Sequence, residues 1–291
     1  MLVGFAPGGG TDVVARIIGQ KMGEYLGVSV VVENHPGGTG TIAADLVAKA
    51  RPDGYTILMG HVNSNAIAPN LFKKMAYDAI KDFQPVVYVG YVPNILVVNL
   101  TVPVKNVAEL ITYSKANPDK VTYASSGIGS TQHLAGEMFK LLTGTTLVHV
   151  PYKGSGQAII DLLAGTVSVN FDTMPPVLPH IQAGKLKALA ISTPKRISQL
   201  PDVPTFEEVG IKGFDVTNWY GVFAPAKTPK EIVDKLNAVI NKVMESPDVK
   251  AKLEAVGTQL GGGTPEEFAS FLRTELIKYQ KLIKDAKVTI E

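Results

Sequence analysis

Cysteine is absent from this chain of 291 residues. Its absence excludes disulfide bonds and thiol chemistry, and it removes the main sequence clue to the redox compartment. Long hydrophobic runs are also missing: no apolar stretch reaches about 18 residues, so we expect no transmembrane helix. Neither sign of charge is in excess, because 28 Lys and Arg oppose 26 Asp and Glu. We therefore expect neither a nucleic-acid surface nor a polybasic membrane patch.

Two further sequence signals are missing. No export signal is visible, yet Met1–Val3 lies directly in an apolar strand, which suggests that an N-terminal segment precedes it. The missing signal therefore gives little support for a cytoplasmic location. The histidines do not pair at i and i+4, so we expect no metal site; they lie at positions 35, 61, 133, 149 and 180.

The order of the elements that are present predicts an α/β fold with two domains. The length is about twice that of a typical domain. Residues 2–60 read as strand, helix, strand, helix, strand, with a β-branched second strand at Val28–Glu33. This order is typical of a parallel sheet covered by helices. A second strand–helix series follows over residues 121–191, and the tail is helical.

The glycine-rich stretch Phe5–Asp12 is the strongest candidate for a ligand site near the N-terminus. Gly8, Gly9 and Gly10 follow a buried strand, and Thr11 and Asp12 are residue types that cap helices. Such a turn leaves backbone N–H groups free at the positive end of a helix dipole, where an anion binds well. The alternative is that the glycines only make a tight turn between a strand and a helix.

Ligands of open α/β sheets bind beyond the carboxyl ends of the strands. By this rule the loops that face a ligand are residues 6–12, 60–65, 125–131, 151–155 and 171–173. They are rich in Gly, Ser, Thr and Asn, contain no arginine, and contain one lysine, Lys153. Backbone N–H groups and hydroxyls of this kind suit a carboxylate better than a polyphosphate, which usually recruits Lys, Arg or a metal.

Most of these loop residues also have a structural interpretation. Ser130 and Ser155 either cap helices or bind a ligand, and His133 either caps or packs or touches the ligand. His61, in a polar loop, is the better candidate for a ligand contact. Asp172 either receives a ligand amine or hydroxyl or fixes a neighbouring loop.

Three other side chains are interpreted in the same way. Asp12 is a structural cap rather than an acid or base. Lys153 is solvated unless the crevice closes over it. Trp219 either walls the pocket or packs between the domains, and packing is favoured.

Enzyme motifs are poorly represented. The chain has no G-x-S-x-G elbow and no Walker A sequence. Gly38–Ala43 matches a degenerate G-x-G-x-x-A after a strand, but a dinucleotide site also needs an acidic residue at the end of the next strand. That strand ends at Met59–His61 without one, so a packing turn is the better interpretation of Gly38–Ala43.

Seven ordered blocks of sequence resemble the Bug family, the solute-binding proteins of tripartite tricarboxylate transporters (the TctC-like proteins). The blocks span some 200 residues, and no single one would be specific. They are residues 7–12, 34–40, 52–56, 126–130, 133–137, 150–154 and 201–205.

The resemblance implies a periplasmic-binding-protein fold of type II, with two α/β domains and a ligand cleft between them that closes on the ligand. The implied first domain covers residues 1–101 and 219–291, and the second covers residues 102–218. The implied crossing segments lie near 99–103 and 216–222. The family's export signal and leading residues have no counterpart here.

The resemblance also implies which residues bind the ligand, and these lie in the loops selected above from strand polarity. In the first domain the implied contacts are Phe5, Ala6, Gly9, Gly10, Thr11, His61, Asn63, Ser64 and Asn65. In the second they are Ser125, Ser126, Gly129, Ser130, Thr131, Lys153, Gly154, Ser155 and Asp172.

Three hypotheses for function follow. The first is a periplasmic, monomeric protein that captures a small carboxylate (a di- or tricarboxylate, an aromatic acid or an acidic amino acid) and delivers it to a membrane permease, with no cofactor, metal or catalysis. The second is a doubly wound α/β enzyme acting on a nucleotide or acyl substrate, which would need a nucleophile and a base that the sequence does not bring together. The third is a binding protein that reports to a sensor.

Overall fold

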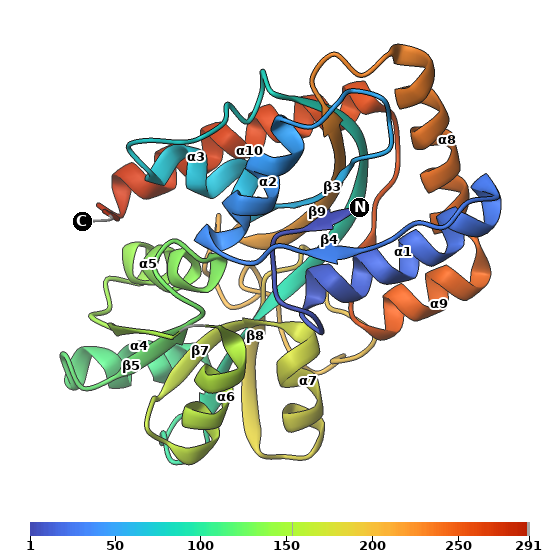
Figure 1. Ribbon diagram of the computed structural model, residues 1–291. Helices are drawn as coiled ribbons and strands as arrows, with labels where there is room; N and C mark the ends of the chain where they lie inside the picture. Colours follow the sequence, from blue (N-terminus) through green and yellow to red (C-terminus); the bar gives the residue numbers. More distant parts are fainter. Residues whose placement is uncertain (153, 290–291) are drawn as a thin grey trace. The chain divides into compact units, whose positions relative to one another are not determined.

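The computed structural model describes residues 1–152 and 154–289, which form two compact units (Figure 1). Unit 1 comprises residues 1–91 and 219–281. Unit 2 comprises residues 92–218 together with the C-terminal residues from 282 onward. The strands β4 and β9 each continue from one unit into the other. The domain division inferred in the sequence analysis stays a prediction.

Unit 1 is built from short strands, helices and parts of β4 and β9. Its elements are β1 (Leu2–Val3), α1 (Gly10–Leu26), β2 (Glu33–Asn34), the 3-10 turn Gly38–Gly40, α2 (Thr41–Ala48), β3 (Leu58–His61), the π-helical turn Asn63–Ile67, α3 (Ala68–Leu71), the first part of β4 (Phe83–Asn99), most of β9 (Thr217–Pro225), α8 (Lys230–Glu245), α9 (Pro247–Ala255), β10 (Gln259–Leu260) and most of α10 (Pro265–Asp285).

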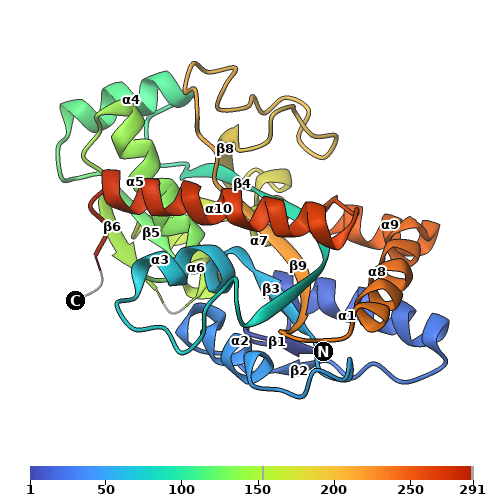
Figure 2. The ribbon, with the colours of Figure 1, turned by 90° about the horizontal axis from the view of Figure 1, so that it is seen from above.

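The sheet of unit 1 has the order β2–β1–β3–β9. β1 runs parallel to β2 and β3, whereas β9 is antiparallel to β3 and brings Tyr220 opposite His61. α1 packs against α8 and α9 (Figures 1 and 2), and α2 contacts β1 and β3. Because β1 and β3 are parallel neighbours, the loops that follow them lie at the same edge of the sheet.

Unit 2 also alternates strands and helices. They are the remainder of β4, α4 (Val107–Ala116), β5 (Thr122–Ser125), α5 (Thr131–Thr143), β6 (Val148–Pro151), α6 (Ser155–Ala164), β7 (Val169–Thr173), α7 (Met174–Gln182), β8 (Leu186–Ile191) and the first residues of β9.

In unit 2, β5 lies between β6 and β7 and is parallel to both. β4 is antiparallel to β7 and β8. α7 packs on β7, β8 and α6 (Figure 1). The segments that follow β5, β6 and β7 therefore leave the sheet at one edge, which brings three of the loops selected from the sequence close together.

Local sequence signals explain several helix ends. The spacing of Asn106 and Glu109 predicts a capping box, and Asn106 does cap α4, since its side chain accepts a hydrogen bond from the Glu109 N–H at 2.9 Å. Gly165, a residue type that predicts the end of a helix, ends α6 in the left-handed conformation at φ 80°. The predicted strand Val28–Glu33 was wrong over most of its length, because only Glu33–Asn34 pairs with β1. Val28 and Val31 are instead 57% and 61% exposed beside the edge of the sheet.

No helix in the described residues has the length and apolar character needed to cross a membrane. The same residues contain no cluster of three or more His, Asp or Glu side chains that could bind a metal ion.

Candidate functional site

The glycine-rich turn between β1 and α1 is fixed from the helix side by Asp12. The prediction that Thr11 or Asp12 caps the helix was wrong, because α1 begins at Gly10 and its N-cap, Gly9, has no side chain. The Asp12 carboxylate accepts hydrogen bonds from the Gly8 N–H at 2.9 Å and from Arg16 Nε at 3.0 Å. Burial raises the pKa of Asp12, but the hydrogen bonds from Arg16 and Gly8 outweigh burial and lower it. Asp12 is therefore structural, as the sequence suggested.

Glycines without side chains allow other parts of unit 1 to pack closely against this region. A Cβ atom added to Gly10 would lie 2.8 Å from the hydroxyl oxygen of Tyr220, so that hydroxyl lies against the first residue of α1. A Cβ added to Gly4 would lie 2.5 Å from the Cα of Gly40. This close contact supports the interpretation of Gly38–Ala43 as a packing turn. Tyr220 was missed by the sequence reasoning; its position in the extended segment beside Trp219 was the available signal.

His61 ends β3 and is a buried, neutral side chain. Its Nδ1 accepts a hydrogen bond from the Asn63 N–H at 3.1 Å, so in the neutral ring the proton is on Nε2. The ring lies edge-on to Phe5 with centroids 4.9 Å apart, and the Tyr220 ring is 5.4 Å away. Burial lowers the pKa of His61 to about 3. At neutral pH the imidazole therefore offers one uncharged N–H donor.

The loop after His61 contains amide atoms with unused hydrogen-bonding capacity. Asn65 Oδ1 accepts bonds from the His61 N–H at 3.3 Å and from Ser64 Oγ at 2.7 Å, which fixes the orientation of the amide. Within the described residues, Asn65 Nδ2 and Asn63 Oδ1 are buried without a partner. Buried polar groups are usually paired, and π-helical turns are frequent at functional sites. The loop is therefore suited to bind a polar ligand or water.

In unit 2, the loop between β5 and α5 uses much of its own hydrogen-bonding capacity. Ser130 is the N-cap of α5, because its Oγ accepts from the His133 N–H at 3.2 Å and donates to the Gly127 carbonyl at 2.7 Å. The Gly127 N–H donates to Ser125 Oγ at 3.1 Å, and the Gly129 N–H donates to His133 Nδ1 at 3.1 Å. The structural interpretation of Ser130 is thus correct, and its contact with a ligand stays a prediction.

Two stacked histidines lie beneath this loop. The rings of His133 and His149 are 4.0 Å apart and nearly parallel, and His149 Nε2 lies 2.6 Å from Ser125 Oγ. Burial lowers the pKa of His133, and burial together with the neighbouring His133 and Lys140 lowers the pKa of His149 to about 3. His149 was not a candidate from the sequence, because nothing in the sequence links residue 149 to residues 125 and 133.

Asp172 and Gln132 join the loops of unit 2. The Asp172 side chain is fully buried and accepts hydrogen bonds from Gln132 Nε2, from Ser155 Oγ at 3.1 Å and from the Thr173 N–H at 2.8 Å. Burial raises the pKa of Asp172, and these hydrogen bonds oppose the rise. Of the two interpretations of Asp172, the structure shows a carboxylate that fixes neighbouring loops. Ser155 does not cap α6, since its hydroxyl is directed to Asp172 and the N-cap is Gly154.

The start of α5 is also bonded to the two strands that continue between the units. Thr131 Oγ1 donates to Asn218 Oδ1 on β9, and Asn218 Nδ2 donates to Asn94 Oδ1 on β4 at 3.0 Å. All three side chains are buried and all belong to unit 2. Trp219, the next residue, packs inside unit 1, where its Nε1 donates to Glu275 Oε2 at 2.9 Å; packing between domains stays a prediction.

The candidate residues fall into two groups, one in each unit, and the structure brings the members of each group near one another. Lys153 lies outside the described residues. Of the others, Ala6, Gly9 and Gly10 are exposed; Phe5, Ser126, Gly154 and Ser155 are half-buried; and Thr11, His61, Asn63, Ser64, Asn65, Ser125, Gly129, Ser130, Thr131 and Asp172 are buried. Their role in ligand binding stays a prediction.

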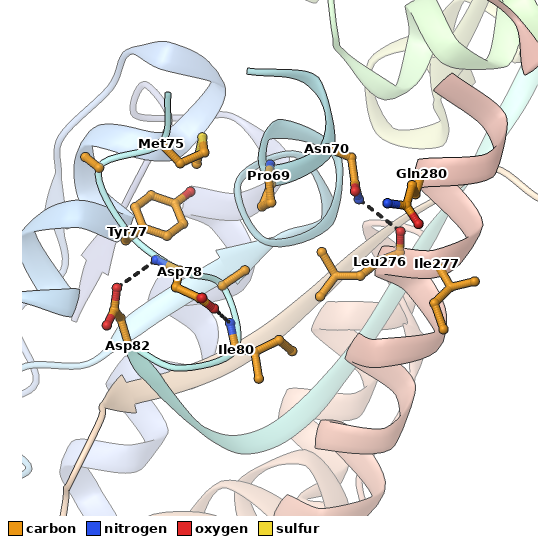
Figure 3. Close-up of a pocket in the computed structure, with 12 residues that line it drawn as sticks. Pro69, Asn70, Met75, Tyr77, Asp78, Ile80, Asp82, Leu276, Ile277 and Gln280 are labelled. Atoms are coloured by element: carbon orange, nitrogen blue, oxygen red, sulfur yellow. Dashed lines mark hydrogen bonds between the residues drawn. The ribbon is translucent and has the colours of Figure 1, made fainter. Parts of the chain in front are cut away.

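A surface pocket of about 670 Å³ in unit 1 lies between the segment 69–82 and α10 (Figure 3). The Asn70 amide spans it by donating to the Leu276 carbonyl at 2.9 Å. Ile277, on α10, is 68% exposed there. No candidate residue lines this pocket, and the sequence gave no signal for it.

Comparison with known proteins identifies the family. The family model described as "Tripartite tricarboxylate transporter family receptor" (TctC) matches residues 14–288. Protein BugT of Bordetella pertussis is 37% identical over 286 residues, which cover 98% of this chain and 88% of BugT.

Two solved structures are similar over nearly the whole chain. Rpa4515 of R. palustris, solved with adipate, is 38% identical with a TM-score of 0.92, covering 99% of this chain and 96% of that one. MatC of Rhodopseudomonas palustris, solved with bound malate, is 35% identical with a TM-score of 0.87, covering 97% of each chain. The α/β fold, the family match and these structures agree: the chain belongs to the TctC or Bug family of periplasmic solute-binding proteins and has their type II fold.

Proposed function

We propose that this protein is a periplasmic receptor that binds a small carboxylate, with dicarboxylates as the first class to test. The observation that carries the proposal is the chemistry of the two groups of loops, which offer uncharged donors such as the His61 N–H, the Asn65 amide and the Ser126 hydroxyl. Neutral donors at strand and helix ends suit a carboxylate. The similarity to proteins solved with adipate and with malate supports the same class.

We propose binding without catalysis. Ser125 and His149 form a serine–histidine contact, the kind of pair that nucleophilic catalysis uses. However, burial lowers the pKa of His149 to about 3, which makes it a weak base at neutral pH. The Ser125 hydroxyl also exchanges hydrogen bonds with Gly127. Ser125 is better explained as part of the loop's internal bonding than as a nucleophile.

We further propose that the protein acts as a monomer and delivers its ligand to the permease subunits of a tripartite tricarboxylate transporter. The match to the receptor family supports this step. A permease partner, rather than a sensor, would be indicated by loss of carboxylate uptake in cells that lack this protein. Uptake must then return with the wild-type gene. A single peak at the monomer mass in light scattering would support the monomer.

The first experiment is a calorimetric titration of the folded protein. The protein is first unfolded and refolded, so that any co-purified ligand is removed. The panel contains adipate, malate, citrate and benzoate beside phosphate and ATP. A bound carboxylate at a hundredfold excess over its Kd should raise the free energy of unfolding by about 2.7 kcal/mol. Binding of a carboxylate that is recovered unchanged supports the proposal. Binding of ATP alone, or conversion of the bound compound, would refute it.

A further inference from the structure

Gln132 is the second residue of α5, and only 3% of it is exposed. Its Oε1 accepts a hydrogen bond from the Ser126 N–H. Its Nε2 donates to Ser155 Oγ at 2.7 Å and also donates to Asp172 Oδ1. A glutamine amide has two N–H donors and one carbonyl acceptor, so both donors and the acceptor are in use. One side chain therefore connects the loop after β5, the start of α6 and the end of β7.

The Ser126 N–H determines which way this amide faces. A backbone N–H can only donate, so it must face Gln132 Oε1 rather than Nε2, and Nε2 is thereby directed to the fully buried Asp172. The other donors to it are also uncharged: Ser155 Oγ, the Thr173 N–H and Asn170 Nδ2, the last at 2.9 Å. With Nε2 directed to Asp172, Oε1 is directed to the Ser126 N–H. The amide orientation, and with it the position of Ser126, is thereby fixed.

We propose that Gln132 is a positioning residue for the ligand site of unit 2, an inference that rests on the proposed function. By bonding to Ser126, Ser155 and Asp172 at once, Gln132 holds three loop segments in one arrangement. The Ser126 hydroxyl and the start of α5 are thereby presented together to the ligand carboxylate. A site organised before binding loses less conformational freedom when the ligand arrives.

The substitution Gln132→Glu tests this by changing the donor and keeping the shape. At about pH 7.5 the new carboxylate faces Asp172 and cannot donate to it, and each carboxylate raises the pKa of the other. Near pH 5 the new group takes up a proton and can again donate to Asp172 and accept from the Ser126 N–H. Of the described histidines beside this loop, His149 has a pKa lowered to about 3, chiefly by burial, and stays largely uncharged over this range, and burial also lowers the pKa of His133.

The readout is the affinity for malate and adipate, measured for variant and wild type at both pH values. We expect Gln132→Glu to bind at least about tenfold more weakly at pH 7.5 and within about threefold of wild type near pH 5. Titration of the ligand affects both proteins equally and cancels in the ratio. Gln132→Met, which has a similar length and no amide, should be weak at both pH values. A ratio that does not change with pH would show that Gln132 only fills space.

Amide hydrogen exchange of the ligand-free protein provides a second test of the role of Gln132. The Ser126 amide should exchange faster than in wild type in Gln132→Met, and in Gln132→Glu at neutral pH. The matched control is Asn99→Asp, the same chemical change at a buried amide of unit 2 that donates to the Leu162 carbonyl at the other end of α6. It should leave Ser126 exchange unchanged. If wild type binds no carboxylate, the proposed function fails. Exchange at Ser126 then decides alone whether Gln132 holds the loop, and unchanged exchange overturns the inference.

Discussion

Removing the titratable ring of His61 should flatten the dependence of stability on pH. The folded protein buries this ring in a neutral form, because burial lowers its pKa to about 3. The unfolded chain has an ordinary histidine with a pKa of about 6.5. Between these two values the unfolded state binds more protons than the folded state. Acidification from pH 7.5 therefore destabilises the protein, and the loss is complete once pH falls below about 3.

The size of the effect follows from the two pKa values. At pH 5 the unfolded state gains RT ln(1 + 10^1.5), which is about 2 kcal/mol, while the folded ring remains almost entirely neutral. The full shift would be worth about 5 kcal/mol near pH 3, as an order of magnitude. His61→Asn retains an acceptor near the position of Nδ1, so the bond from the Asn63 N–H can form. The variant cannot titrate, and its loss of stability between pH 7.5 and 5 should be smaller than that of wild type by about 2 kcal/mol.

Urea unfolding followed by tryptophan fluorescence measures this difference directly. Trp219 is the only tryptophan, and it is buried in unit 1 together with His61. Phe5→Leu is the matched control: it removes part of the ring contact with His61 but keeps the histidine, so it should lower stability at both pH values and leave the pH slope near that of wild type. If His61→Asn and wild type lose the same stability between pH 7.5 and 5, within about 0.5 kcal/mol, the ring is not held neutral by burial.

Three further substitutions test other contacts. Ser130→Ala removes the N-cap of α5 and should cost about 1 kcal/mol, a fall in Tm of about 2–4 °C, and weaken carboxylate binding by about 1–2 kcal/mol if the hydroxyl also contacts the ligand. Calorimetry with titration separates the two effects, and an unchanged Tm would refute the cap. Trp219→Phe leaves a buried Glu275 oxygen without its indole donor and should cost about 1–3 kcal/mol in urea unfolding followed by circular dichroism; no loss would contradict the contact. Gly10→Ala places a Cβ 2.8 Å from the Tyr220 hydroxyl and should destabilise, and Tyr220→Phe should relieve most of that loss in the double variant; additive effects would argue against the close approach.

The sequence by itself determined the class of fold and some of the positions at which helices begin and end. Alternating strand and helix patterns predicted an α/β protein, because the periodicity of apolar residues depends only on local geometry. The capping box at Asn106 and the stop at Gly165 were also predictable, since each depends on a few neighbouring residues. The carboxyl-end rule for parallel sheets selects the loops around His61 and Ser130 from the sequence pattern alone.

Tertiary structure decided how those loop residues are used. Thr11 and Ser155 are residue types that cap helices, yet neither does so. The N-cap of α1 is Gly9, two residues before Thr11, and the N-cap of α6 is Gly154, one residue before Ser155. Capping depends on backbone angles that a residue type favours but does not fix. The same limit applied to Val28–Glu33. Its β-branched residues favour a strand, but they lie beside the edge of the sheet and only Glu33 pairs with β1.

The contacts between residues distant in sequence were beyond prediction. Tyr220 lies against Gly10, the rings of His133 and His149 stack, and Gln132 bonds to Asp172, over separations of 16 to 210 residues. A single sequence carries no signal for such pairs, because chain folding, rather than local propensity, brings them together. The sequence therefore predicted which loops bind a ligand, whereas only the tertiary structure decided which donors in them are already paired and which remain available.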